Sequence, residues 1–268
     1  MSKIKERNRI NQIEPSPEGW RPPLFRVGTS PWDKFVAKVR RLFDLQASSI
    51  WRDLGDILPT CSGDVVDVGC GAQPYRELFP AEAHYRGIDT EKVPEEFGYV
   101  VPDTTYYDGK RWPLEDGSVD VALATETLEH VESVSGFLSE AARCIRSPNG
   151  RLILTVPFSA RWHFIPWDYW RFTPSGLLTI LRPHRFTVTH IWARGNALTV
   201  ACYKIMALIL PLLFSSDRNP IRRFTSKALG FACSPVLTVS ALVGNLSLRS
   251  SGGDDCLGYT IVAVLAKD

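Results

Sequence analysis

Short apolar runs, separated by turn residues and by one amphipathic stretch, organise the middle of this chain. From Ser133 to Arg146 apolar residues recur at three- and four-residue spacings, which predicts an amphipathic helix. The first segment, 65–68, is mostly apolar, as is typical of a buried parallel strand. Further strands are predicted at residues 85–88, 105–107, 119–124, 152–156, 186–192 and 259–265. Strands that alternate with helical segments predict an α/β fold around a mostly parallel sheet.

The first 60 residues have a different pattern and are predicted to form an arm and a helical cap beside the main domain, 61–268. Charged residues and five prolines predict an extended arm over residues 1–31. Apolar residues recur near helical spacing over 32–45 and again over 50–58, which predicts one or two helices before the core. These helices would either cap the ligand pocket or pack on the sheet edge.

A glycine-bracketed turn, Gly69-Cys70-Gly71, directly follows the first predicted strand. Residues 76–79 are predicted to open a helix after it. A strand, a Gly-x-Gly turn and a helix in succession let main-chain N–H groups approach a ligand closely. Gln73-Pro74 occupies the place of the third glycine of a dinucleotide-binding fingerprint. Asp89 ends the second predicted strand about 20 residues downstream, where a ribose-binding carboxylate belongs.

Three further segments follow this turn in order, at 108–120, 121–131 and 147–157. Together with the turn they resemble the motifs of class I S-adenosylmethionine-dependent methyltransferases of the small-molecule branch, and the resemblance spans roughly residues 63 to 160. It implies a Rossmann-like sheet of seven strands, mostly parallel with an antiparallel last strand, and helices on both faces. An apolar helical insertion, 197–250, precedes the last strand and lies outside the resemblance.

The resemblance implies S-adenosyl-L-methionine as the cofactor and assigns roles to the residues that match the motifs. Residues of the turn would lie under the methionine portion, Asp89 would bind both ribose hydroxyls, and Asp108 would read the adenine amino group. Helix or turn capping is the alternative role for Asp67 and Glu126. The full set of predicted cofactor-binding residues is Asp67, Gly69, Cys70, Gly71, Asp89, Thr90, Asp108, Gly109, Thr125 and Glu126.

The predicted substrate residues lie in the loop after the fifth strand, where the resembling family contributes substrate contacts. They are Arg161, Trp162, Asp168, Tyr169 and Arg171. A general base is needed only for a weak nucleophile such as a hydroxyl. His163 and His130 are the candidates, because histidine titrates near neutrality. A structural or surface role is the alternative for each histidine.

The string Glu126-x-x-Glu129-His130 would place three ligands on one helix face, and a few methyltransferases with a similar string bind a divalent ion there. The same string is common in relatives without metal, where it only starts a helix. No metal is therefore predicted.

The formal net charge is only +2, but charge is distributed unevenly along the chain. Residues 61–135 contain sixteen Asp or Glu and five Lys or Arg, whereas residues 136–250 contain three and fourteen. The basic half would meet an anionic substrate or a membrane surface, or it complements the acidic half within the fold. No nucleic-acid motif accompanies the charge, so no nucleic-acid partner is expected.

The insertion contains two apolar runs, 197–214 and 228–248, which are interrupted by Pro211 and Pro235 and joined by a basic segment. Lys204 near the middle of the first run would cost about 2.5–3.5 kcal/mol at the centre of a bilayer, which disfavours a transmembrane helix. A helical hairpin seated on anionic lipid, an apolar lid and a dimer surface are the alternatives that the sequence leaves open.

The predicted activity is transfer of a methyl group to a small-molecule acceptor, anionic or lipid-linked in view of the basic, apolar C-terminal half. A nicotinamide-dependent oxidoreductase is the enzymatic rival, and Gln73-Pro74 and the segment at Asp108 count against it. A catalytically inactive cofactor-binding scaffold, associated with a membrane or a partner protein, is the rival of another class. Six cysteines without C-x-x-C spacing and a polar first eleven residues predict a cytoplasmic protein, with peripheral membrane contact as the alternative.

Overall fold

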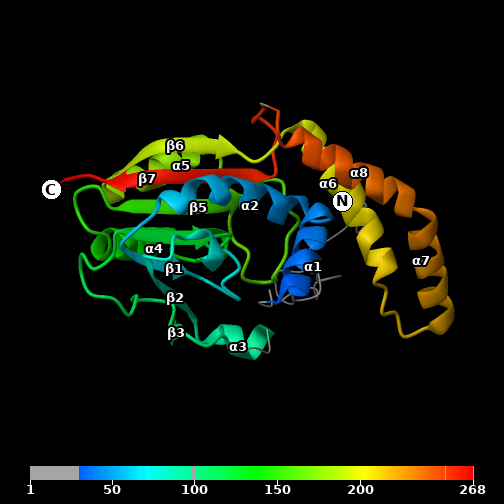
Figure 1. Cartoon of the computed structure of the whole chain (residues 1–268), viewed down its shortest axis with the longest axis horizontal. Helices are drawn as coiled ribbons and strands as arrows, with labels where there is room; N and C mark the ends of the chain where they lie inside the picture. The colour runs from blue at the N-terminus through cyan, green and yellow to red at the C-terminus, as the bar shows by residue number, and fades with distance from the viewer. Residues whose placement is uncertain (1–29, 98–99, 251, 268) are drawn as a thin grey trace, which may run out of the picture.

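Seven strands form one mixed sheet, and helices cover both of its faces (Figure 1). This computed structural model describes residues 30–97, 100–250 and 252–267, so the predicted arm lies almost entirely outside the described residues. The strand order is β3-β2-β1-β4-β5-β7-β6, and β7 runs antiparallel to both of its neighbours. The strands are β1 (Asp64–Val68), β2 (His84–Thr90), β3 (Thr104–Tyr107), β4 (Val121–Thr125), β5 (Arg151–Pro157), β6 (Phe186–Ala193) and β7 (Gly258–Leu265). This topology confirms the predicted sheet.

Helices lie before and between these strands. The α-helices are α1 (Pro31–Leu42), α2 (Leu45–Ile57), α3 (Lys92–Phe97), α4 (Val134–Cys144), α5 (Pro174–Leu181), α6 (Ala197–Leu213), α7 (Pro220–Ala232) and α8 (Ser234–Ser247). Short 3₁₀ turns lie at η1 (Leu58–Thr60), η2 (Arg76–Leu78), η3 (Leu128–His130) and η4 (Arg182–His184).

Successive residues of the central strands enter different cores, because side chains alternate across a sheet. Val65 of β1 packs with Ile50 and Leu54 of α2. Its neighbour Val66 packs in the other core, which contains Leu138 of α4 and residues of α5. The helix before the core therefore covers a face of the sheet, and the expectation that it packs on the sheet edge is wrong. The apolar residues of α2 cover one face of the central strands, and the other core covers the opposite face, so these strands are buried on both faces.

Two local predictions need correction. The helix expected at 76–79 is only the 3₁₀ turn η2, because Phe79 precedes Pro80 and adopts an extended ψ of 147°. Helix α5, which the sequence pattern did not predict, begins at a well-formed cap: the Thr173 hydroxyl accepts from Gly176 N–H, and Pro174 stands at the first helical position.

Helices α6, α7 and α8 form a helical lobe beyond the carboxyl ends of the parallel strands (Figure 1). The two-helix hairpin is corrected to three helices, because the basic segment belongs to α7 and is not a connection. Pro211 lies in the last turn of α6 without ending it, whereas Pro235 opens α8. Leu45 of α2 is buried in the same cluster as residues of α6 and α8, so the lobe packs on α2.

Lys204 and the length of the lobe helices bear on the membrane alternatives. Lys204 Nζ donates to Ser159 O at 2.8 Å, which ties α6 to the loop after β5. Among the described residues, no single helix has both the length and the apolar character to cross a membrane. Helices α7 and α8 pass that test together, but they are bent by 51° where they meet.

Candidate cofactor and substrate site

The turn after β1 has a backbone that requires glycine. Gly69 and Gly71 have φ of 69° and 51°, in the left-handed region. Thr127 lies directly over Gly69, so an added Cβ there would come within 2.5 Å of Thr127 Cγ2. Gly69 N–H donates to Ile88 O at 2.9 Å, which holds the turn against β2. The turn lies at the carboxyl ends of the parallel strands, where ligands bind in open α/β sheets.

Gln73 stands in place of the third glycine, and it too adopts a left-handed φ, of 55°. Its side chain holds this conformation, because Nε2 donates to Thr104 Oγ1 at 2.9 Å and Oε1 accepts from Arg76 at 3.1 Å. The amide also fills the space over Gly87, where an added Cβ would lie 2.7 Å from Nε2. The backbone of the turn thus has the left-handed conformation that a third glycine would allow, with Gln73 in that position.

Cys70 is the middle residue of the turn, and its side chain is buried against β2 and β3. Its Sγ lies 3.6 Å from Thr104 Oγ1 and close to Gly87. Burial raises the pKa of the thiol to about 12, so the thiol is neutral at physiological pH. The Cys70 side chain therefore packs the turn from inside.

Asp89 lies at the end of β2 beside the turn and is buried. One carboxylate oxygen accepts from Gly71 N–H and the other from Thr90 N–H, both at 2.8 Å. Burial raises the pKa of this carboxyl, and the two N–H donors oppose that rise. Each carboxylate oxygen can accept a further hydrogen bond, so the group can still bind a pair of ligand hydroxyls.

Asp67 lies inside the sheet, and its carboxyl accepts from the Tyr85 hydroxyl at 2.7 Å. Burial raises the pKa of Asp67 to about 7, although the hydrogen bond from Tyr85 opposes the rise. The negative charge of Asp89 also raises it. Asp67 is thus a carboxyl that is half protonated near neutral pH, held between β1 and β2.

Asp108 and Gly109 follow β3 and are exposed. Asp108 Oδ1 accepts from Lys110 N–H at 2.9 Å, which closes a local turn. Gly109 has a left-handed φ of 80°, and an added Cβ would contact Thr90 at 3.4 Å. The backbone therefore brings the segment after β3 beside the end of β2, next to Asp89.

Glu126 follows β4 and forms an ion pair with a fully buried arginine. Arg194 Nη2 donates to Glu126 Oε1 at 2.7 Å and to Val156 O at 3.0 Å. Thr155 Oγ1 also donates to Glu126 Oε1, at 3.1 Å. One carboxylate oxygen of Glu126 is thus engaged inside the protein. Thr125 Oγ1, one residue earlier, is buried and has no hydrogen-bond partner among the described residues.

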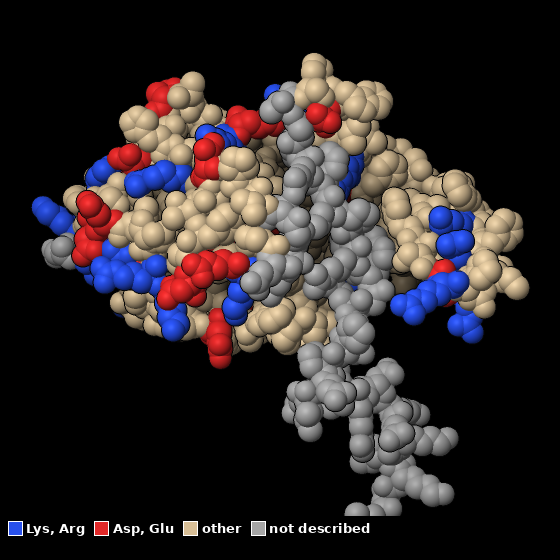
Figure 2. Space-filling model, turned by 90° about the horizontal axis from the view of Figure 1, so that it is seen from below, with Lys and Arg blue, Asp and Glu red and all other residues tan. Residues whose placement is uncertain are grey.

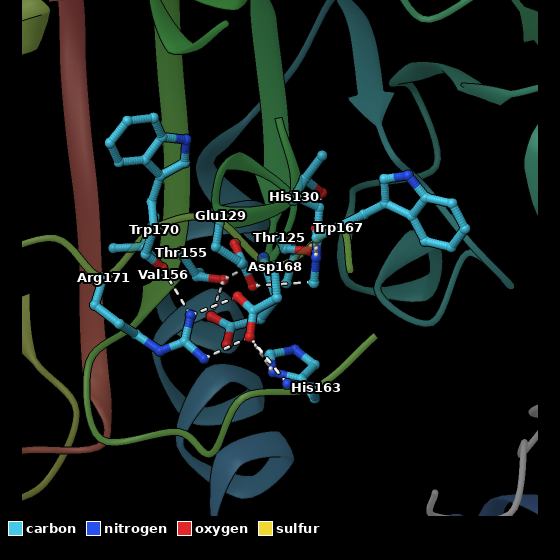
Figure 3. Close-up of polar contacts among 12 residues, drawn as sticks. Thr125, Glu129, His130, Thr155, Val156, His163, Trp167, Asp168, Trp170 and Arg171 are labelled. Carbon is cyan, nitrogen blue, oxygen red and sulfur yellow. Dashed lines mark hydrogen bonds and ion pairs between the residues drawn. The ribbon is translucent and has the colours of Figure 1, made fainter. Parts of the chain in front are cut away.

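A second polar cluster joins the turn after β4 to the loop after β5 (Figure 3). Asp168 accepts two hydrogen bonds from Arg171, at 2.6 and 2.7 Å, in a bidentate pair. The other side of Asp168 faces His163, whose main-chain N–H and Nδ1 lie 3.0 and 3.1 Å from Asp168 Oδ2. Burial tends to lower the pKa of His163, but its hydrogen bonds to Asp168 and to Arg161 O outweigh burial and raise it. Asp168 therefore orients His163 as a carboxylate orients a catalytic imidazole.

His130 and Glu129 complete this cluster. His130 Nδ1 lies 2.7 Å from Trp167 O, and since a carbonyl only accepts, Nδ1 carries the proton. Burial lowers the pKa of His130, which favours the neutral ring near neutral pH, and its Nε2 lies 3.7 Å from Glu129 Oε1. Glu129 is 0% exposed, and neither carboxylate oxygen has a hydrogen-bond partner among the described residues. Burial raises the pKa of Glu129 well above its usual value, which favours the neutral acid.

The metal ligands suggested by the sequence are rearranged in the structure. Glu129, His130 and His163 offer ligand atoms that all lie within 4.8 Å of one another. Glu126 is not part of this group, because its carboxylate pairs with Arg194. A neutral Glu129 is a poor metal ligand, so the absence of a metal stays a prediction.

The remaining predicted substrate residues surround this cluster. Asp168 and Arg171 bind each other, so they hold the shape of the loop. Trp162 and Tyr169 are both partly exposed, and Arg161 accepts through its carbonyl from Arg171. The side chains of Glu129, His130, His163 and Asp168 converge, whereas the rings of Trp167 and Trp170 point away from them (Figure 3).

Comparison with known proteins agrees with this geometry. The profile of a family described as "Methyltransferase domain" matches residues 34–190, more than half of the chain. The chain belongs to this family. This confirms the resemblance to class I methyltransferases that the motifs indicated. No curated protein sequence matches the chain significantly.

Solved structures share the fold of this methyltransferase domain at low sequence identity. The proposed methyltransferase of Haloferax volcanii, in complex with the Trm112 methyltransferase activator, is 18% identical, with a TM-score of 0.54 over 88% of this chain and 96% of that one. A proposed sarcosine dimethylglycine methyltransferase from Galdieria sulphuraria is 14% identical, with a TM-score of 0.50 over 90% and 93%. The [4+2]-cyclase SpnF is 17% identical, with a TM-score of 0.50 over 83% and 82%. The fold alone is thus compatible with more than one reaction.

Several residues that shape the site of this methyltransferase domain were not predicted. Arg194 lies directly after β6, about 70 positions from Glu126, and only the three-dimensional structure brings the two together. Gly258 leaves room for it, since an added Cβ would overlap the Arg194 guanidinium. Tyr85 and Thr127 were also missed. A tyrosine near the start of the second strand and a threonine two residues after another strand were the available signals, and each is weak alone.

Proposed function

We propose that this chain is an S-adenosylmethionine-dependent methyltransferase that acts on a small-molecule acceptor, anionic or lipid-linked. The observation that carries the cofactor assignment is Asp89. Its carboxylate is buried at the end of β2, held in place by Gly71 and Thr90 N–H, and both oxygens can accept further hydrogen bonds. That is the arrangement needed to bind the two hydroxyls of a ribose.

The surrounding residues fit the rest of the cofactor. Gly69 and Gly71 bring main chain close to where the methionine portion would lie. Asp108 and Gly109 stand beside the ribose acid, where they would contact the adenine. The unpartnered Thr125 hydroxyl offers a buried hydrogen-bonding group at the end of β4. S-adenosylmethionine supplies a methyl group on a positively charged sulfur, which reacts by in-line displacement, so the protein contributes mainly positioning.

The acceptor side is proposed to use His163 as the general base when the acceptor is a hydroxyl. Its Nδ1 is held by Asp168, which is in turn fixed by Arg171, so Nε2 can take a proton from the acceptor. His130 is the second candidate, because burial lowers its pKa and so favours an unprotonated Nε2 near neutral pH. The basic, apolar C-terminal half supports an anionic or lipid-linked acceptor.

The test is calorimetric titration of the purified chain with S-adenosylhomocysteine, with a nicotinamide dinucleotide as the control ligand. We expect micromolar binding of the first and none of the second. Asp89→Ala should weaken binding by about 1.5–3 kcal/mol, since it removes a charged hydrogen-bond acceptor. The matched control is Glu82→Ala, an exposed carboxylate before β2, which should bind like the unmodified chain.

Unchanged affinity in Asp89→Ala would show that the ribose assignment is wrong. Binding of neither ligand would favour the inactive scaffold instead. Once cofactor binding is established, turnover with a cell extract as the source of acceptors separates an enzyme from a scaffold.

A further inference from the structure

The helical lobe exposes many large apolar side chains, although others form its buried cluster. In α7, Ile221, Phe224 and Phe231 are 72%, 74% and 69% exposed, and their spacing of three and seven residues places them on one face of the helix. The exposed large apolar residues of the whole lobe, named here the apolar face, are Leu198, Ile205, Leu208, Phe214, Ile221, Phe224, Leu229, Phe231, Val236, Val239, Leu242 and Leu246.

Apolar residues of α6, including Val200, Met206 and Ile209, form the buried side of the lobe, whereas α7 packs inward through a small residue. Gly230 is the buried residue of α7, and an added Cβ there would lie 2.9 Å from the backbone of Leu213. In α8, Leu237 is buried together with small residues such as Ala241 and Gly244, while Val239, Leu242 and Leu246 are exposed. A helix of a globular protein normally turns its apolar stripe toward the core, and α7 does the opposite. An exposed patch this extensive marks an interaction surface.

Exposed cations flank the apolar face on α7. Arg222, Arg223 and Lys227 are exposed, and Arg218 precedes the helix. Asp217 is the single acidic residue in the sequence 197–250. Figure 2 shows basic side chains gathered at one end of the lobe, with an acidic side chain beside them and uncharged atoms around. Aromatic and aliphatic residues on one side and Arg or Lys along its border are typical of helices that lie in a membrane interface.

We propose that the apolar face docks on the surface of an anionic lipid bilayer, with α7 lying along the interface. Its apolar side chains would enter the boundary between headgroups and acyl chains, and its cations would contact anionic headgroups. The charge favours lipid over a second copy of this chain, because a symmetric dimer through this face would bring like-charged groups together. The lobe lies beyond the carboxyl ends of the parallel strands (Figure 1), so docking places the candidate site near the lipid.

The experiment is sedimentation of the full chain with sucrose-loaded vesicles, of phosphatidylcholine alone or with about one third phosphatidylglycerol. We expect at least tenfold tighter binding to the anionic vesicles, and weaker binding at high salt. The triple variant Ile221→Ser, Phe224→Ser, Phe231→Ser should bind at least tenfold more weakly. Arg222→Gln with Arg223→Gln should reduce the preference for anionic vesicles.

The matched control is Leu178→Ser, an exposed apolar residue of α5 outside the lobe, which should leave vesicle binding unchanged. Affinity for S-adenosylhomocysteine and the unfolding temperature show that each variant is folded, and they separate this proposal from the proposed function. Equal binding of the triple variant and the unmodified chain would overturn it. So would absence of vesicle binding, whether the chain is then a dimer that the triple variant dissociates or a monomer whose apolar face is otherwise covered.

Discussion

The buried carboxyl of Asp67 should make the stability of the protein depend on pH, and the structure determines both the direction and the magnitude of this dependence. Burial raises the pKa of its carboxyl from 3.8 to about 7 in the folded chain. A raised pKa means that the folded state holds a proton that the unfolded chain releases. The protonated Asp67 carboxyl therefore contributes fully to stability below about pH 4, and this contribution is lost as the pH rises toward 7.

The perturbation is Asp67→Asn, which keeps the shape and an acceptor for Tyr85 but cannot ionise. One pKa unit corresponds to about 1.36 kcal/mol. Between roughly pH 4.5 and pH 8, the free energy of unfolding of the unmodified chain should therefore fall by about 3 kcal/mol relative to that of the variant. Urea unfolding at both pH values measures this difference. The control is Glu82→Gln, an exposed carboxyl, for which we expect no such difference.

A difference in unfolding free energy that stays constant, within about 0.5 kcal/mol, across that range would refute the reasoning. It would mean that Asp67 is already ionised in the folded protein at neutral pH. Burial would then not be the dominant influence on its carboxyl.

Three further predictions concern the same region. Gly69→Ala should destabilise the fold by about 1–3 kcal/mol, because the residue has a left-handed φ and the new methyl group would overlap Thr127; an unchanged urea midpoint would contradict this. Arg194→Met should cost about 3–5 kcal/mol, because it leaves the Glu126 carboxylate without its partner. Adding Glu126→Gln should recover part of that loss, and additive effects in the double variant would argue against the pair. Dialysis against EDTA should leave the unfolding temperature unchanged; a stoichiometric divalent ion would show that Glu129 is a metal ligand and not a neutral acid.

The sheet was predictable because its signal is local. Each central strand is a short apolar run bounded by turn residues, and the order of motifs determined how the runs connect. The helix after Gly69-Cys70-Gly71 was predicted from the usual motif, but Pro80 shortens it to a single 3₁₀ turn. Helix α5 was missed although Thr173-Pro174 is a good start signal, since the neighbouring segment was interpreted as a substrate loop.

The candidate site was predictable only where its residues follow strands. Asp89 and Asp108 could be placed in the site because the motifs identify them and because both lie at the carboxyl ends of strands. The contact of His163 with Asp168 is local, but its approach to His130 joins segments that are 33 residues apart. Spacing along the chain carries no information about such a contact. The same holds for Arg194, which follows β6 and pairs with Glu126 after β4.

The bond from Lys204 to Ser159 O has a thermodynamic consequence. It links a helix of the lobe to the loop that carries His163 and Asp168, so the positions of lobe and loop are not independent. Coupling between two binding events is reciprocal. If the bilayer raises the affinity for an acceptor, then the bound acceptor raises the affinity for the bilayer by the same factor. One route for this coupling is the hydrogen bond from the Lys204 ammonium group to the Ser159 carbonyl. Measuring vesicle affinity and acceptor affinity in Lys204→Met would show how much coupling free energy this hydrogen bond carries.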